Sequence, residues 1–129
     1  MSQDNVDVVE AWLASFTADA DAFRETLHPE IEWFPFEDNH SPSHGIDAAM
    51  RIRSEWLASW NAMRAELEDV HDEGDSVIAS VHVSGQGKTS GADVDVRLHM
   101  HFRMLDGKIV YLFEHTDKAE ALAAAGLSE

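Results

Sequence analysis

The chain of 129 residues contains no cysteine, and only nine lysines and arginines stand against 25 aspartates and glutamates. Without cysteine there can be no disulfides, thiolate nucleophiles or cysteine-ligated metal centres. The formal charge of −16 repels nucleic acid and anionic membrane surfaces, so we expect neither as a partner. No apolar run approaches the roughly 20 residues of a membrane span, and the start lacks the basic-then-apolar pattern of a signal peptide. The sequence therefore predicts a cytoplasmic protein.

The length suits one domain, which we expect to span residues 1–129. Apolar residues recur at helical spacing over residues 5–17 and 46–60, and a second short helix is expected to end at His28-Pro29. Residues 31–36 are short, aromatic and interrupted by proline, which is typical of an edge strand. Period-two alternation predicts four further strands, at 63–71, 76–86, 92–104 and 108–116. The segment Asp117 to Glu120 has the spacing of a capping box and predicts a last helix over 119–125.

The four consecutive strands are joined by short, turn-forming segments, which indicates an antiparallel meander. Each predicted helix has one apolar stripe, and the sheet is the only large surface on which to bury it. The expected fold class is therefore α+β. It consists of a curved antiparallel sheet with helices packed on one face.

Three stretches carry a family resemblance: "LHPEIEWFPF", "HGIDAAMRI" and "SGADVDVRLHMHFRMLDGKIVYLFEHTDKAEALAAAGL". Together with the order of elements, they resemble the SnoaL-like polyketide-cyclase group of the nuclear transport factor 2-like superfamily. The resemblance implies a cone-shaped, cystatin-like roll, with the N-terminal helices on the concave face of the sheet and a pocket between sheet and helices. It implies no single reaction, because members include cyclases, isomerases, hydrolases and dehydratases. Acids of the ketosteroid isomerase type are replaced here by Pro35-Phe36 and Met100, and the arginine–aspartate pair of limonene epoxide hydrolases has no counterpart in the apolar inward row.

The strand that contains His99 and His101 has one apolar row, which we expect to face the interior. Which residues of the following strand, 108–116, face the interior depends on the turn that joins the two strands. A two-residue turn at Asp106-Gly107 places the histidines on the same face as Glu114, and local apolar matching slightly favours it. A three-residue turn with a glycine bulge, Leu105-Asp106-Gly107, instead turns Glu114 inward. The resemblance favours the bulge, because similar sequences often carry arginines where this one has Tyr111 and Phe113, as an outward row would. We therefore adopt the bulged register.

In this register His99, His101, Tyr111 and Phe113 coat the outer face of the sheet. An outer face with these residues suits a self-complementary contact, and the resemblance also suggests back-to-back dimers, so we expect a homodimer. A zinc site is the other interpretation of the two histidines, with His82 as the third ligand, but it needs three convergent imidazoles. We predict no metal and no cofactor.

Glu114 is the carboxylate we expect to do chemistry. In an apolar pocket its charged form is disfavoured, so its pKa would rise and it could act as an acid or base near neutral pH. The other interpretation is a glutamate that is hydrogen-bonded to a neighbouring strand or helix. His44 and His28 are the two imidazoles expected to look inward and assist, unless they merely bond to backbone. The expected ligand-binding residues are apolar or aromatic: Trp12, Trp33, Trp56, Trp60, Met100, Phe102 and Leu112.

Residues 37–44 form a polar loop with two carboxylates and two histidines, expected near the mouth of the pocket. Our leading hypothesis is a pocket protein that performs cofactor-independent acid–base chemistry, of isomerase, cyclase or hydrolase type, on a hydrophobic small molecule. A non-catalytic ligand-binding or dimerisation module is the alternative. A metal-dependent hydrolase that uses the histidine row is the third hypothesis.

Overall fold

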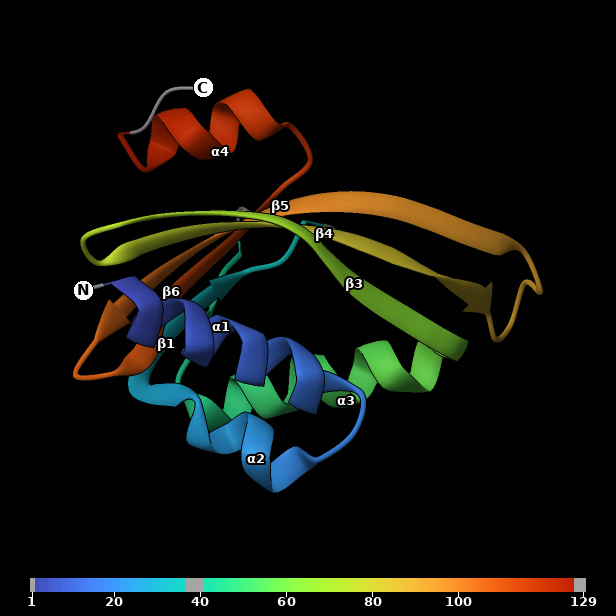
Figure 1. Ribbon diagram of the computed structural model, residues 1–129. Coiled ribbons are helices and arrows are strands. Elements are labelled where there is room, and N and C mark those ends of the chain that lie inside the picture. Colours follow the sequence, from blue (N-terminus) through green and yellow to red (C-terminus); the bar gives the residue numbers. More distant parts are fainter. Residues whose placement is uncertain (1, 37–40, 127–129) are drawn as a thin grey trace.

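The computed structural model describes residues 2–36 and 41–126. Within these ranges the structure has four helices and one six-stranded sheet, whose strand order is β2-β1-β6-β5-β4-β3. The helices are α1 (Ser2–Phe16), α2 (Ala20–Glu25), α3 (Ile46–Ser59) and α4 (Lys118–Ala124). The strands are β1 (Leu27–Phe34), β2 (Ser43–His44), β3 (Trp60–Glu73), β4 (Ser76–Gly87), β5 (Asp93–Leu105) and β6 (Lys108–His115). Figure 1 shows α1, α2 and α3 on the inner side of the curved sheet, as expected, and α4 on its other side. None of the helices in the described ranges is both long and apolar enough to cross a bilayer.

The meander β3-β4-β5-β6 is antiparallel as predicted, but the first strand differs from its prediction. It begins at Leu27 rather than residue 31, pairs in parallel with β6, and is flanked by β2 instead of forming the edge. Pro29 is tolerated because the β1–β6 register shifts between Leu27 and Glu32, where no regular ladder needs its missing N–H. Helix α2 ends before Thr26, because the Thr26 carbonyl accepts the backbone N–H of Ile109 on β6 at 2.8 Å.

The turn between β5 and β6 corrects the predicted bulge. Leu105 lies opposite Lys108, so Asp106-Gly107 is a two-residue turn, with φ of 55° and 76°. Two left-handed residues are what a type I′ hairpin turn needs. The bulge comes afterwards, at Val110, because Met104 pairs with Ile109 and Arg103 pairs with Tyr111.

The displaced bulge has the same effect on β6 as the predicted one. Beyond Val110, Glu114 lies opposite Met100 on the inner face of the sheet, and Phe113 lies opposite His101 on the outer face. The inner face is filled by an aromatic cluster. Trp12 of α1 is at its centre, with ring centroids 5.2–5.7 Å away on four partners: Phe16, Phe23, Trp33 and Phe102.

Candidate active site

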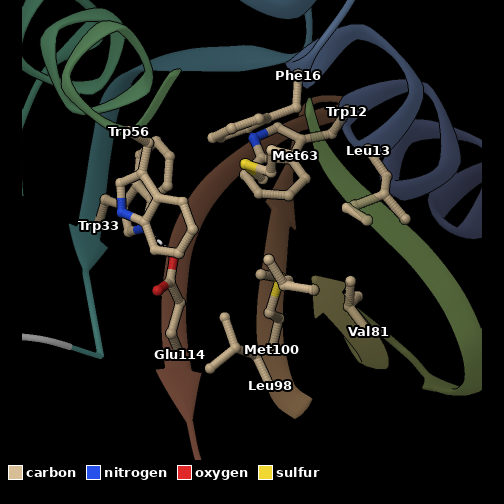
Figure 2. A pocket seen from close by; sticks show the side chains of 12 residues that line it. Trp12, Leu13, Phe16, Trp33, Trp56, Met63, Val81, Leu98, Met100 and Glu114 are labelled. Atoms are coloured by element: carbon tan, nitrogen blue, oxygen red, sulfur yellow. Dashed lines mark hydrogen bonds between the residues drawn. The ribbon is translucent and has the colours of Figure 1, made fainter. Parts of the chain in front are cut away.

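A cavity lies between α1, α3 and the inner face of β3 to β6 (Figure 2). It contains about 330 Å³ of space between protein atoms, including its open side, but the centre of a water molecule has only about 20 Å³ in which to move. A larger ligand therefore enters only when half-buried side chains such as Trp56 and Met63 move aside. The lining residues are Trp12, Leu13, Phe16, Trp33, Trp56, Met63, Ala65, Val81, Val83, Leu98, Met100 and Glu114.

Glu114 is the charged residue in this lining, and it is only 3% exposed. Its Oε2 accepts the indole N–H of Trp33 at 2.7 Å, and its Oε1 accepts the backbone N–H of Phe36 at 3.1 Å. Figure 2 shows the carboxylate rising from β6 toward Trp33. Because each oxygen accepts an N–H, the carboxyl group is held in one orientation against β1 and the segment that follows it. Both interpretations from the sequence hold at once: Glu114 lines an apolar cavity, and it is hydrogen-bonded to a neighbouring strand.

This arrangement suits proton abstraction. A carboxylate held at a fixed orientation beside an apolar hollow can accept a proton from an O–H or an acidic C–H of a bound molecule. The aromatic walls exclude water and restrict how a flat molecule lies against the carboxylate. Trp33 and Phe36 act as positioning groups, because they set the direction in which the Glu114 oxygens point.

The expected ligand-binding residues divide into two groups. Trp12, Trp33, Trp56 and Met100 line the cavity. The others lie outside its lining: Trp60 stacks on Trp56 with centroids 5.4 Å apart, and Phe102 and Leu112 are fully buried opposite each other in the core. The lining also includes seven residues that were not among the expected site residues: Leu13, Phe16, Met63, Leu98, Ala65, Val81 and Val83. The alternation of the β3 and β4 segments is the signal that could have indicated the last three.

The two histidines expected to assist Glu114 do not lie with it. His28 is on β1, and its Nδ1 accepts the backbone N–H of Glu30 at 3.0 Å. His44 is on β2, with an exposed ring whose Nε2 lies 3.2 Å from the Glu30 carboxylate. Neither belongs to the cavity lining. The expected inward orientation of His44 is wrong, because its ring is exposed, whereas His28 bonds to the backbone, which was the other interpretation. Their segments join the sheet at its β2-β1 edge, where polar side chains reach water. The part of the expected mouth loop at 37–40 lies outside the described residues.

The outer-face histidines have partners other than one another. His99 Nδ1 lies 2.8 Å from the hydroxyl of Ser80, and His101 Nε2 lies 3.2 Å from that of Ser76. His82 instead pairs with Asp95 at 2.9 Å. Within residues 2–36 and 41–126, no group of three or more histidine, aspartate or glutamate side chains is placed to hold a metal ion.

Burial controls the charge of these imidazoles. Burial, followed by the charge of Arg103 and then His115, lowers the pKa of His101 to about 4. Burial is also the main cause that lowers the pKa values of His99 and His115. The three rings are therefore largely neutral at pH 7, because they are packed against protein atoms rather than surrounded by water.

An aromatic patch, defined here as Phe34, His101, Tyr111 and Phe113, covers the outer face of β1, β6 and β5. Phe34 contacts Phe113 and Tyr111 with ring centroids 5.2 and 5.5 Å apart, and His101 meets Tyr111 at 5.3 Å. Helix α4 packs beside this patch on the same face, where Ala121 and Leu122 cluster with Ile78 of β4, the strand partner of His101 (Figure 1).

The curved sheet and the three helices on its inner face define an α+β roll. The chain belongs to the SnoaL-like domain family, whose sequence model matches residues 8–112. This confirms the resemblance drawn from the sequence. A search of curated proteins finds no match.

Solved structures with similar folds support this assignment. A candidate SnoaL-like polyketide cyclase from Jannaschia sp. CCS1 superposes with a TM-score of 0.80 at 21% identity, over 98% of this chain and 94% of that one. A hypothetical protein of ketosteroid isomerase-like fold from Catenulispora acidiphila, in complex with trimethylamine, gives 0.77 at 16% identity, over 95% and 94%. TerC, co-crystallised with polyporic acid, gives 0.76 at 18%, over 96% and 97%. At these identities the likeness establishes the fold alone.

Proposed function

We propose that the protein binds a flat, apolar, oxygen-bearing small molecule in this cavity, and that Glu114 removes a proton from it. The observation that carries the proposal is a buried carboxylate, fixed by two N–H donors, in the wall of a cavity whose other lining residues are all apolar or aromatic. The aromatic lining favours a flat ligand, because ring faces and edges pack well on one another. The co-crystallisation of TerC, a protein of the same fold, with polyporic acid supports a small-molecule ligand.

The chemistry needs no group beyond the chain and its ligand. The Glu114 carboxylate takes a proton from a carbon next to a ligand carbonyl, and the electron pair of that C–H bond moves into an enolate. Reprotonation at the same or another carbon then returns the carboxylate. The net result is exchange or isomerisation. Where the enolate carbon instead attacks a second carbonyl of the ligand, a C–C bond closes a ring, and the resulting alkoxide takes the proton back from Glu114.

Proton transfer can be tested without knowing the natural substrate. 2-Tetralone is a flat bicyclic ketone with acidic C–H groups, and their exchange in D₂O is followed by loss of the proton NMR signal. We expect the protein to accelerate exchange by about 100-fold or more over buffer, and Glu114→Gln to abolish the acceleration, as general-base catalysis requires. Glu55→Gln, which changes an exposed carboxyl on α3, should keep the wild-type rate. Equal exchange by wild type and Glu114→Gln would refute the role of Glu114.

We further propose that the aromatic patch on the outer face mediates a homodimer. Phe34, Tyr111 and Phe113 are half-buried through contact with one another, and they lie on the solvent side of a sheet, where such a cluster suits a self-complementary contact. Light scattering after size exclusion should give twice the 14.4 kDa chain mass for the wild type and the single-chain mass for Phe113→Lys. Leu105→Lys, at the 48% exposed hairpin tip, is the matched control and should stay dimeric. A wild-type protein with the single-chain mass at every concentration contradicts the proposal.

A further inference from the structure

Trp12 contributes an unusual polar group to the cavity. The side chain is 1% exposed, and among the described residues its indole nitrogen has no hydrogen-bond partner. Figure 2 shows the ring reaching from α1 into the hollow, with the nitrogen toward its inner end. A buried indole N–H normally has a partner, as that of Trp33 does in Glu114.

Core packing alone does not account for this donor. A buried N–H without an acceptor lowers stability relative to an apolar ring of the same shape. Phenylalanine would fill an ordinary core position without this penalty. Trp12, however, lines the cavity that we propose to be the ligand site, so an acceptor atom of a ligand can occupy the place in front of its nitrogen.

We propose that the Trp12 N–H is the group that selects the ligand, by donating a hydrogen bond to a carbonyl or ether oxygen. The ligand class is therefore a flat apolar ring system with an oxygen acceptor on the edge that enters beside α1. This inference rests on the proposed function, because it assumes that the cavity is a ligand site. It adds the feature that separates ligands from non-ligands of the same size.

Trp12 and Glu114, two of the polar residues of the cavity, occupy adjoining walls. Trp12 and Trp33 meet edge to face, with ring centroids 5.7 Å apart and planes at 65°, and Trp33 in turn holds the Glu114 carboxylate. A ligand in the hollow thus meets a donor from α1 and an acceptor from β6. An oxygen at the first and an acidic hydrogen at the second define one orientation of the ring system, which apolar packing alone would leave open.

The test compares two probes of the same skeleton, 2-tetralone and tetralin, in which a CH₂ group replaces the carbonyl. Calorimetry or tryptophan fluorescence gives the ratio of their dissociation constants for each variant. We expect Trp12→Phe to reduce the preference for 2-tetralone by about tenfold, because a site built to bond an oxygen penalises the analogue that lacks it. Trp60→Phe shortens a tryptophan that stacks on Trp56 but lies outside the cavity lining, and it should leave the ratio unchanged.

A second variant covers the loss of ring area in Trp12→Phe. Site-specific replacement of Trp12 by 3-benzothienylalanine keeps the bicyclic ring and removes only the N–H, and it should reduce the preference by the same factor. A ratio that stays at the wild-type value in both Trp12 variants overturns the inference, as does an equal change in Trp60→Phe. If Glu114→Gln still abolishes exchange in that case, the proposed function stands, but the Trp12 N–H does not select the ligand. If neither probe binds the wild type, the proposed function itself is refuted.

Discussion

Trp33→Phe is expected to lower the free energy of unfolding by about 3 kcal/mol, one of the largest effects of a single substitution in this protein. The tryptophan is 1% exposed and packs against Trp12, Phe16 and Phe23. Phenylalanine leaves a cavity and removes the donor that lies 2.7 Å from Glu114 Oε2. A buried carboxylate that loses a hydrogen-bond donor is destabilised far more than a neutral acceptor would be.

The charge of Glu114 can be separated from the lost ring area by a double-mutant cycle. Glu114→Gln replaces one oxygen by an NH₂ group, which cannot accept an N–H and so opposes either Trp33 or Phe36. In the double variant the amide can turn its NH₂ toward the space left by the indole. We therefore expect the two substitutions together to cost about 1–2 kcal/mol less than the sum of their separate effects.

Trp12→Phe is the matched control for this cycle. Trp12 is as deeply buried as Trp33 and also lines the cavity, but its nitrogen does not bond to Glu114. Its combination with Glu114→Gln should be additive within about 0.5 kcal/mol, measured by urea unfolding at pH 7. An additive result for Trp33 as well would mean that the Trp33–Glu114 hydrogen bond does not stabilise the folded state.

The interaction tested by this cycle could not be predicted from the sequence. Trp33 and Glu114 are 81 residues apart, and they meet because β1 pairs in parallel with β6, placing Trp33 beside Leu112. The alternation that identified each strand reports on which residues share a face of that strand. It carries no information about which distant strand becomes its neighbour or in which direction.

Local signals were far more informative. Asp117 accepts the backbone N–H of Glu120 at 3.1 Å and begins α4, as the capping-box spacing predicted. The meander strands also begin and end within three residues of their predicted limits. In both cases the structure follows from residues within a few positions of one another, so tertiary packing had little to override.

The connection between β5 and β6 could be predicted from the sequence only in part. Asp106-Gly107 is a strong signal for a two-residue turn, and the structure has one. The bulge at Val110 has no such signal, because β6 carries large apolar residues on both faces and either row could have turned inward. Tertiary packing decides: Glu114 is inward where Trp33 and Phe36 can bond to it.

Lowering the pH is expected to destabilise the protein through His101, a second large effect. Burial holds the pKa of His101 at about 4 in the folded state, against 6.5 for the free side chain. Because the folded pKa is the lower one, the unfolded chain binds more protons between pH 6.5 and 4. The stability of the neutral ring is therefore fully present above about pH 6.5 and is lost as the pH falls toward 4.

The size of the effect follows from the shift. Between pH 7 and 4.5 the His101 contribution should fall by roughly 2 kcal/mol, allowing for residual solvent screening of the outer face. The lowered pKa values of His99 and His115 act in the same direction. The carboxylates also titrate in this range, so the wild-type slope alone does not isolate one residue.

Comparison of variants isolates it. His101→Phe keeps an aromatic ring against Tyr111 but cannot be protonated, so its unfolding free energy should fall by about 2 kcal/mol less than that of the wild type between pH 7 and 4.5. Ser76→Ala removes the hydroxyl 3.2 Å from His101 Nε2 while leaving the buried imidazole, and it should retain the wild-type slope. Urea unfolding at each pH gives the required free energies. Parallel pH profiles for wild type and His101→Phe would show that protonation of His101 does not couple to unfolding, and the low-pH loss would then belong to the other titrating groups.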